Sequence, residues 1–158
     1  MRDPFVLEPT YRFLLDEDVK SLLPLFPKKR VKTLAMLGLH ADMRDDKVVI
    51  EAWKRGYIIV TANNRDFNRA VEKFLSHGPK RECRCLWGLV LLPNGQAVQQ
   101  RLLKNLNDLE SRLRLDGKRT TWKEVHQSHL RVSVQRGGVL SVSRLRRCTY
   151  HQEQSKTA

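Results

Sequence analysis

The stretch that decides the fold of this chain is Tyr57-Ile58-Ile59-Val60-Thr61-Ala62-Asn63-Asn64-Arg65-Asp66-Phe67. Its first four residues are apolar or aromatic without alternation, which is typical of a central strand in a parallel sheet covered on both faces. Gly56 precedes this run and a polar, acid-bearing turn follows it. Ligands of such sheets bind just past the carboxyl ends of the strands. The residues after Val60 are therefore the first candidates for function.

Two further segments predict acids at the same edge of the sheet. The short apolar strand Phe13-Leu14-Leu15 runs directly into Asp16-Glu17-Asp18. The segment Asp45–Arg55 predicts a helix, because it has acids in its first turn, apolar residues on one face and Gly56 as a stop. Two strand ends and one helix start thus bring carboxylates together.

The order of the predicted elements indicates an α/β fold. Strands at Tyr11–Asp16, Val31–Gly38, 57–60 and 86–92 alternate with helices, which favours a three-layer α/β/α architecture with a parallel central sheet. One long helix is predicted from Gln96 to Leu115, because apolar residues recur there every three or four positions. Its leucines are expected to pack in the core or, as the alternative, to form the interface of a homodimer. These leucines are Leu102, Leu106, Leu109 and Leu113.

The C-terminal third of the chain follows a different pattern. Apolar and polar residues alternate in 130–134 and 139–145 around a glycine turn, which predicts a β-hairpin at the edge of the sheet. We therefore divide the chain into a leader (1–10), a main domain (11–116), a basic β-hairpin extension packed on the same domain (117–150) and a disordered tail (151–158).

The net charge of +13 and the pI near 10.2 indicate a polyanionic partner, and nucleic acid is the first candidate. No run approaches the roughly 20 apolar residues of a membrane-spanning helix, so no membrane partner is expected. Residues 1–10 contain no secretory signal, and an odd count of three cysteines fits a reducing compartment. A cytoplasmic location is predicted.

Basic residues crowd the last third of the chain, where we expect a surface for RNA phosphates. An acidic protein partner is the alternative for the same surface. The residues of this surface are Lys118, Arg119, Lys123, Arg131, Arg136, Arg144, Arg146 and Arg147, and Arg65 in the decisive stretch is a further RNA-binding candidate.

The clustered acids predict a metal site. Crowded carboxylates raise each other's pKa unless a cation or donor intervenes. Mg²⁺ and Mn²⁺ prefer oxygen ligands, which Asp16, Asp45 and Asp66 can offer from three loops. With a phosphodiester bound, such ions activate water and stabilise the leaving oxygen. The pattern therefore predicts a metal-dependent nuclease.

These motifs resemble the PIN-like nuclease superfamily. The segments 13–19, 45–50 and 56–67 are similar to its small prokaryotic members with a Leu-Leu-Asp-Glu-Asn/Asp motif in strand one, which are related to toxin ribonucleases of toxin–antitoxin pairs. The resemblance covers residues 11–115. It implies a PIN-like three-layer fold, a Mg²⁺- or Mn²⁺-dependent endoribonuclease activity and a protein antitoxin as partner.

The resemblance also implies roles for individual residues. Asp16 matches the metal ligand of strand one, and Asp45 matches the acid that opens the helix before the third strand. Asn63 and Asp66 match the polar and acidic positions after the threonine, and Thr61 matches the threonine that orients the cluster. Asn63 departs from the aspartate of many relatives, and a neutral amide gives up a charge that would hold the metal.

Several alternatives stay open at this point. The chain can be a non-catalytic RNA-binding module that has lost the metal geometry, or a nuclease directed at DNA. Asp66 can instead cap a helix that begins at Phe67. His126 and His129 are expected to face solvent, and Trp122 is either a core residue or a base-stacking residue.

Overall fold

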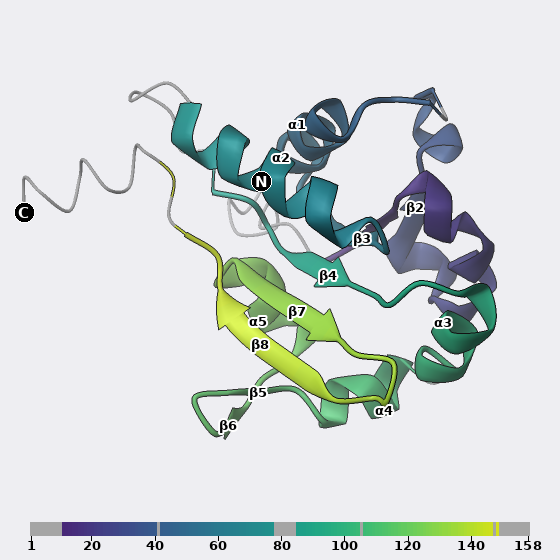
Figure 1. Ribbon diagram of the computed structural model, residues 1–158, viewed down its shortest axis with the longest axis vertical. Coiled ribbons are helices and arrows are strands. Elements are labelled where there is room, and N and C mark those ends of the chain that lie inside the picture. Colours follow the sequence, from purple (N-terminus) through teal and green to yellow (C-terminus); the bar gives the residue numbers. More distant parts are fainter. Residues whose placement is uncertain (1–10, 41, 78–84, 105, 147, 149–158) are drawn as a thin grey trace, which may run out of the picture.

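A six-stranded sheet forms the centre of the molecule, in the order β2-β1-β3-β4-β7-β8 (Figure 1). The first five strands in this order pair in parallel, and β8 runs antiparallel to β7 at the edge. The strands are β1 (Phe13–Leu15), β2 (Val31–Thr33), β3 (Ile58–Thr61), β4 (Leu89–Leu91), β7 (Leu130–Val134) and β8 (Leu140–Arg144). The predicted α/β class, the parallel central sheet and the C-terminal hairpin are confirmed.

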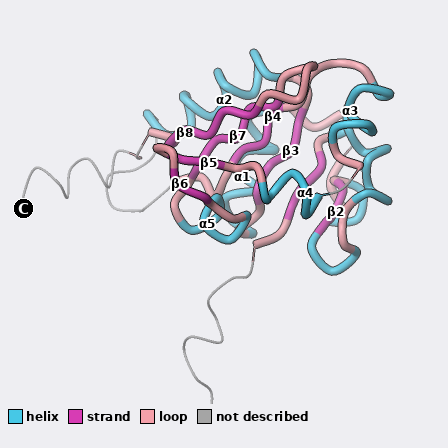
Figure 2. Tube along the Cα trace, turned by 90° about the horizontal axis from the view of Figure 1, so that it is seen from below, coloured by secondary structure: helices cyan, strands magenta, loops and turns pink. Residues whose placement is uncertain are grey.

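Helices cover both faces of this sheet, so the fold has three layers (Figure 2). Successive strand residues point to opposite faces. Leu14 and Ile59 pack against α1 (Asp45–Arg55) and α2 (Asn64–His77). Phe13 and Ile58 belong to the apolar cluster on the other face. That face is covered by the 3₁₀ helix η2 (Glu17–Leu25), α3 (Gln96–Leu102), α4 (Leu106–Ser111) and α5 (Trp122–Gln127).

The structure is a computed structural model that describes residues 11–40, 42–77, 85–104, 106–146 and 148. The predicted leader (1–10) and tail (151–158) lie outside these residues. Within the described part of the chain, no helix is both long enough and apolar enough to cross a membrane.

The corner between α1 and β3 forms as predicted. Helix α1 begins at Asp45 and ends at Gly56, whose N–H bonds to carbonyls of the last turn. Gly56 has a φ of 76°, in the left-handed region that favours glycine. The chain then enters β3, whose residues are all buried. This corner fixes the direction of β3, which carries Thr61 to the far edge of the sheet.

The prediction of one long helix over 96–115 is wrong. The segment forms two short helices, α3 and α4, followed by the strand pair β5 (Arg114–Leu115) and β6 (Lys118–Arg119). Apolar periodicity records which side chains are buried, and it continues across a helix break without revealing it. The leucines at 106, 109 and 113 are buried in the chain's own core, and Leu102 packs against it. The core use of these leucines is confirmed, and the homodimer stays a prediction.

The predicted strand over Val31–Gly38 is correct only in its first half. After Thr33 the chain forms a 3₁₀ turn, η4 (Ala35–Leu37), that ends at Gly38. The Thr33 hydroxyl accepts a hydrogen bond from the N–H of Met36 at 3.3 Å. Such a bond between side chain and backbone offers the chain an alternative to the strand ladder.

Candidate functional site

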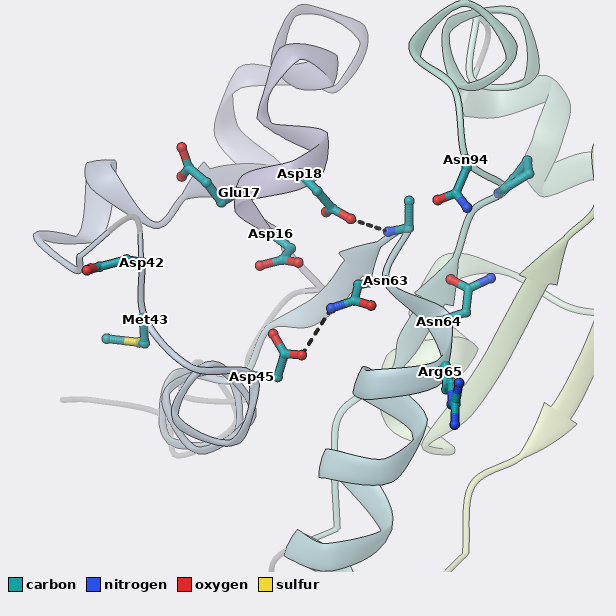
Figure 3. Close-up of a pocket in the computed structure, with 12 residues that line it drawn as sticks. Asp16, Glu17, Asp18, Asp42, Met43, Asp45, Asn63, Asn64, Arg65 and Asn94 are labelled. Atoms are coloured by element: carbon teal, nitrogen blue, oxygen red, sulfur yellow. Dashed lines mark hydrogen bonds between the residues drawn. The ribbon is translucent and has the colours of Figure 1, made fainter.

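A pocket of about 790 Å³ opens at the carboxyl edge of β1 and β3 (Figure 3). Loops that follow β1, β3 and β4, together with the start of α1, supply its walls. The lining residues are Asp16, Glu17, Asp18, Asp42, Met43, Asp45, Ala62, Asn63, Asn64, Arg65, Pro93 and Asn94. The parallel sheet carries these strand ends to one edge, as the sequence predicted. Of the predicted site residues, Asp16, Asp45, Asn63 and Arg65 line this pocket together.

Asp16 is held at the base of the pocket by its neighbour in the sheet. Its N–H donates to the carbonyl of Val60 at 2.9 Å, which continues the pairing of β1 with β3. Its carboxylate accepts a hydrogen bond of 3.0 Å from the hydroxyl of Thr61. The same hydroxyl accepts the N–H of Asn63 at 3.0 Å. Thr61 thus orients both Asp16 and the turn after β3.

Asn63 connects the two sides of the pocket. Its side-chain Nδ2 donates to the carboxylate of Asp45 at 3.1 Å (Figure 3). Asp45 is the first residue of α1, where the helix dipole favours a negative charge. The amide of Asn63 therefore supplies one hydrogen-bond donor to a carboxylate that lies among other acids.

Asp18 reaches the same pocket from the opposite wall. Its carboxylate accepts the N–H of Ala62 at 3.3 Å (Figure 3). This bond ties η2 to the turn after β3, and it places a second carboxylate beside Asp16. In the sequence, Asp18 belongs to the Asp16-Glu17-Asp18 segment that follows the first strand.

The carboxylates of the pocket resist ionisation. Burial, and after it the negative charge of Asp18, raise the pKa of Asp16 to about 6. Burial also raises the pKa of Asp18. The pKa of Asp45 is raised by burial and then by the charges of Asp16, Asp66 and Asp46. A cation in the pocket would relieve both the desolvation and the repulsion.

The donor set of the pocket fits Mg²⁺ or Mn²⁺ in kind, because both ions prefer carboxylate and amide oxygens. Asp16 and Asp45 would hold the ion, with Asn63 Oδ1 as a neutral oxygen if its amide turned over. Within the described residues, however, no three His, Cys, Asp or Glu side chains gather closely enough to hold a metal ion. The residues therefore suit an ion that keeps several waters beside one or two carboxylates, as Mg²⁺ usually does.

The structure does not bring Asp66 into this pocket. Asp66 is exposed in the first turn of α2 and borders a neighbouring pocket of about 410 Å³ with Arg69 and Lys73. Asp45 lines both pockets, so it lies between Asp16 and Asp66. The prediction that Asp66 caps a helix beginning at Phe67 is wrong, because α2 begins at Asn64.

The predicted RNA-binding residues are spread over the molecule. Arg65 lines the acidic pocket. Arg144 pairs with Leu130 at the start of β7 and thus lies toward the opposite edge of the sheet. Lys118 and Arg119 are exposed on β6, Arg131 is half-buried in β7, Arg146 follows β8, and Arg147 lies outside the described residues.

Helix α5 and its buried residues were missed in the sequence. His126 is 1% exposed, and its Nε2 lies 2.8 Å from the carbonyl of Gly56. The expectation of a solvent-facing His126 is therefore wrong. Trp122 is buried edge-to-face against Phe13, so it is a core residue and does not stack on bases. The capping-box pattern of Thr121 and Glu124 could have predicted the start of α5. The N–H of Glu124 donates to the hydroxyl of Thr121.

The site stands without support from relatives. No protein-family model matches this chain, and no match was found among curated proteins or among solved structures. The resemblance to PIN-like nucleases stays a prediction, and the chemistry of the pocket is the basis for assigning a function.

Proposed function

We propose that this chain is a PIN-like, divalent-metal-dependent ribonuclease whose active site is the pocket that contains Asp16, Asp45 and Asn63. One observation carries the proposal: three carboxylates with raised pKa values share a pocket at the carboxyl edge of a parallel sheet. The net charge of +13 supports a polyanionic substrate. Carboxylates that repel one another in a positively charged protein favour a cation as their partner.

Each residue of the pocket has a distinct part in this proposal. Asp16 and Asp45 would hold Mg²⁺ or Mn²⁺, and a bound ion would supply an activated water and neutralise charge on the scissile phosphate. Thr61 keeps the Asp16 carboxylate in place through its 3.0 Å hydrogen bond. Asn63 fixes Asp45 through its amide. Arg65, exposed at the rim, attracts the phosphate backbone.

A non-catalytic RNA-binding module is the second candidate. Asn63 favours it, because its amide already donates to Asp45 at 3.1 Å and occupies one carboxylate oxygen that a metal would need. The absence of a three-ligand group among the described residues favours it as well. The two candidates differ in whether RNA is cut.

The test is cleavage of a labelled single-stranded RNA in Mn²⁺, in Mg²⁺ and in EDTA, with a DNA of the same sequence beside it. Asp16→Asn and Asp45→Asn should each abolish cleavage. The matched control is Asp116→Asn, which makes the same chemical change on an exposed residue whose left-handed backbone an asparagine tolerates. Cleavage that persists in EDTA or in Asp16→Asn refutes the nuclease proposal.

Asp66→Asn belongs in the same experiment. Asp66 is a predicted ligand, yet it lines the neighbouring pocket. If Asp66 acts only through its charge on Asp45, the variant should retain cleavage and need a different Mn²⁺ concentration. Complete loss of cleavage would instead make Asp66 a member of the active site.

A further inference from the structure

The carboxyl edge of the sheet holds arginines as well as acids. Arg136 lies in the turn between β7 and β8, two residues after Val134, which ends β7 at this edge of the sheet. Arg101 lies on α3, which follows β4. Both side chains belong to exposed residues. Figure 1 shows the β7–β8 turn on the same side of the molecule as α3.

Arg136 is joined directly to the wall of the acidic pocket. Its Nη1 donates to the main-chain carbonyl of Asn94 at 2.9 Å, and Asn94 lines the pocket (Figure 3). Arg101 in turn donates from Nη2 to the carbonyl of Arg136 at 2.9 Å. The Arg136 guanidinium therefore lies against a segment that lines the pocket, and the Arg101 guanidinium lies against the main chain of Arg136.

These hydrogen bonds fix the two side chains without neutralising them. A carbonyl oxygen uses one of the five N–H donors of a guanidinium and carries no full charge. Within the described part of the chain, neither Arg101 nor Arg136 forms an ion pair with an acid. Two positioned guanidinium groups without counter-charges have the chemistry to bind an anion such as a phosphate.

The arginines near the opposite edge are in a different state. Arg144 pairs with Asp116 at 2.9 Å. Arg146 pairs with Glu72 at 3.4 Å and bonds to the Glu72 carbonyl as well. Their charges are balanced inside the protein, so they have less to gain from a phosphate. The sequence pointed to Arg136, Arg144 and Arg146 alike and did not single out Arg101, whereas the structure separates the ion-paired Arg144 and Arg146 from Arg101 and Arg136.

We propose that Arg136 and Arg101 bind the phosphodiester backbone of a single-stranded RNA as it leaves the acidic pocket. The proposal rests on the ribonuclease function for its choice of ligand. The strand would run from the pocket past Asn94 to the β7–β8 turn and α3, and the two arginines would contact phosphates outside the cleavage site. They are positioning residues, and the acids of the pocket do the chemistry.

The test compares two double variants with the same loss of charge. The first is Arg101→Gln with Arg136→Gln, in which the glutamine amides can still donate to carbonyls. The matched control is Arg144→Gln with Arg146→Gln. Binding of a fluorescent 12-nucleotide single-stranded RNA is followed by anisotropy in EDTA, where no cleavage interferes, at several salt concentrations. Urea unfolding of each variant checks that the fold is intact.

Each phosphate contact on a single strand contributes roughly 0.7 to the slope of log K against log salt concentration. The loss of two contacts should therefore reduce this slope by about 1.4 and weaken RNA binding about 25-fold at 0.1 M salt. The control should bind as the wild type does, within about twofold. Equal weakening in both variants would mean that net charge alone acts, and unchanged binding in the first would place the RNA elsewhere. Either result overturns the proposal.

Further arms separate the sources of the signal. A DNA strand of the same sequence shows whether the 2′-hydroxyl contributes, and weakening of both strands alike still supports a backbone site. A double variant that binds RNA as tightly as wild type can still fail to bind an acidic protein. That result would identify the surface as a protein-docking face and would contradict the proposal. If binding depends on these arginines and no RNA is cut, the nuclease function fails while the binding surface stands. If RNA is cut in an Asp16-dependent way and the Arg101/Arg136 double variant binds RNA as wild type does, the nuclease function stands and the proposed binding surface fails.

Discussion

Replacing Asp16 by asparagine should stabilise the metal-free protein at neutral pH, although it removes the central acid of the candidate site. The pKa of Asp16 is raised from its usual 3.8 to about 6, first by burial and then by the charge of Asp18. The folded protein therefore binds the Asp16 proton more tightly than the unfolded chain does. Stability linked to this proton is complete below pH 3.8 and is lost as the pH rises through about 6.

The magnitude follows from the difference between the two pKa values. A pKa difference of one unit corresponds to 1.36 kcal/mol, so ionising Asp16 costs the folded state at most about 3 kcal/mol above pH 7. Between pH 4.5 and pH 8 the linkage grows by about 2 kcal/mol. The asparagine carries no such cost, and its side-chain oxygen can still accept the Thr61 hydroxyl.

The assay is urea unfolding of wild type and Asp16→Asn in EDTA at pH 4.5 and at pH 8. The free energy of unfolding of the variant, relative to wild type, should rise by about 2 kcal/mol between the two pH values. Asp116→Asn, an exposed acid, serves as the control and should show a much smaller change. Mn²⁺ should stabilise wild type at pH 8 and leave Asp16→Asn unchanged.

A gap between Asp16→Asn and wild type that is the same at both pH values would refute the reasoning. It would mean that the Asp16 carboxylate is not desolvated in the folded protein. A wild type that gains stability over the variant as the pH rises would reverse the sign and point to a fixed cation partner for Asp16.

Three other changes test the pocket and the core. Asn63→Asp adds a carboxylate beside Asp45 and removes its donor, so the melting temperature in EDTA should fall and its rise with Mn²⁺ should exceed that of wild type. Thr61→Val removes the hydroxyl between Asp16 and the Asn63 N–H and should lower the free energy of unfolding by about 1–3 kcal/mol, whereas Thr61→Ser should stay near wild type. Gly88→Ala places a Cβ 3.1 Å from Ile58 Cγ1 and Val125 Cγ1, at a φ of +152°, and should cost about 1–3 kcal/mol in urea unfolding. Gly137→Ala, which meets nothing within 4 Å, is the control.

Each of these changes has an outcome that contradicts its reasoning. If Mn²⁺ stabilises the Asn63→Asp variant less than it stabilises wild type, Asp45 and residue 63 do not belong to the metal site. Equal unfolding curves for Thr61→Val and Thr61→Ser would mean that the hydroxyl contributes nothing. Equal stability of Gly88→Ala and Gly137→Ala would show that the tight packing of Gly88 on Ile58 relaxes without cost.

The sequence predicted those features that depend on local pattern. The unalternating run before Thr61 predicted a strand buried on both faces, and β3 is buried throughout. The strand ends and the helix start predicted the meeting of Asp16 and Asp45, because a parallel sheet carries its carboxyl ends to one edge. These inferences need only the periodicity of each segment and the topology that follows from its order.

Features that depend on contacts between distant segments could not be predicted in this way. Arg144 and Arg146 looked like free charges in the sequence, and only the folded chain sets them against Asp116 and Glu72. The first turn of α2 points Asp66 toward the neighbouring pocket, although its spacing from Thr61 matched the motif. Burial of His126 likewise follows from the position of α5 on the corner at Gly56.

The charge distribution separates RNA binding from RNA cleavage. The chain has a net charge of +13, yet five of its 17 acids line one pocket. The field of the whole molecule attracts a polyanion, whereas the local field of the pocket repels a phosphate. Under the proposed function, a divalent cation must occupy the pocket before a scissile phosphate can enter it. RNA should therefore bind the Arg101 and Arg136 surface in EDTA, and only metal should draw the backbone onto Asp16 and Asp45.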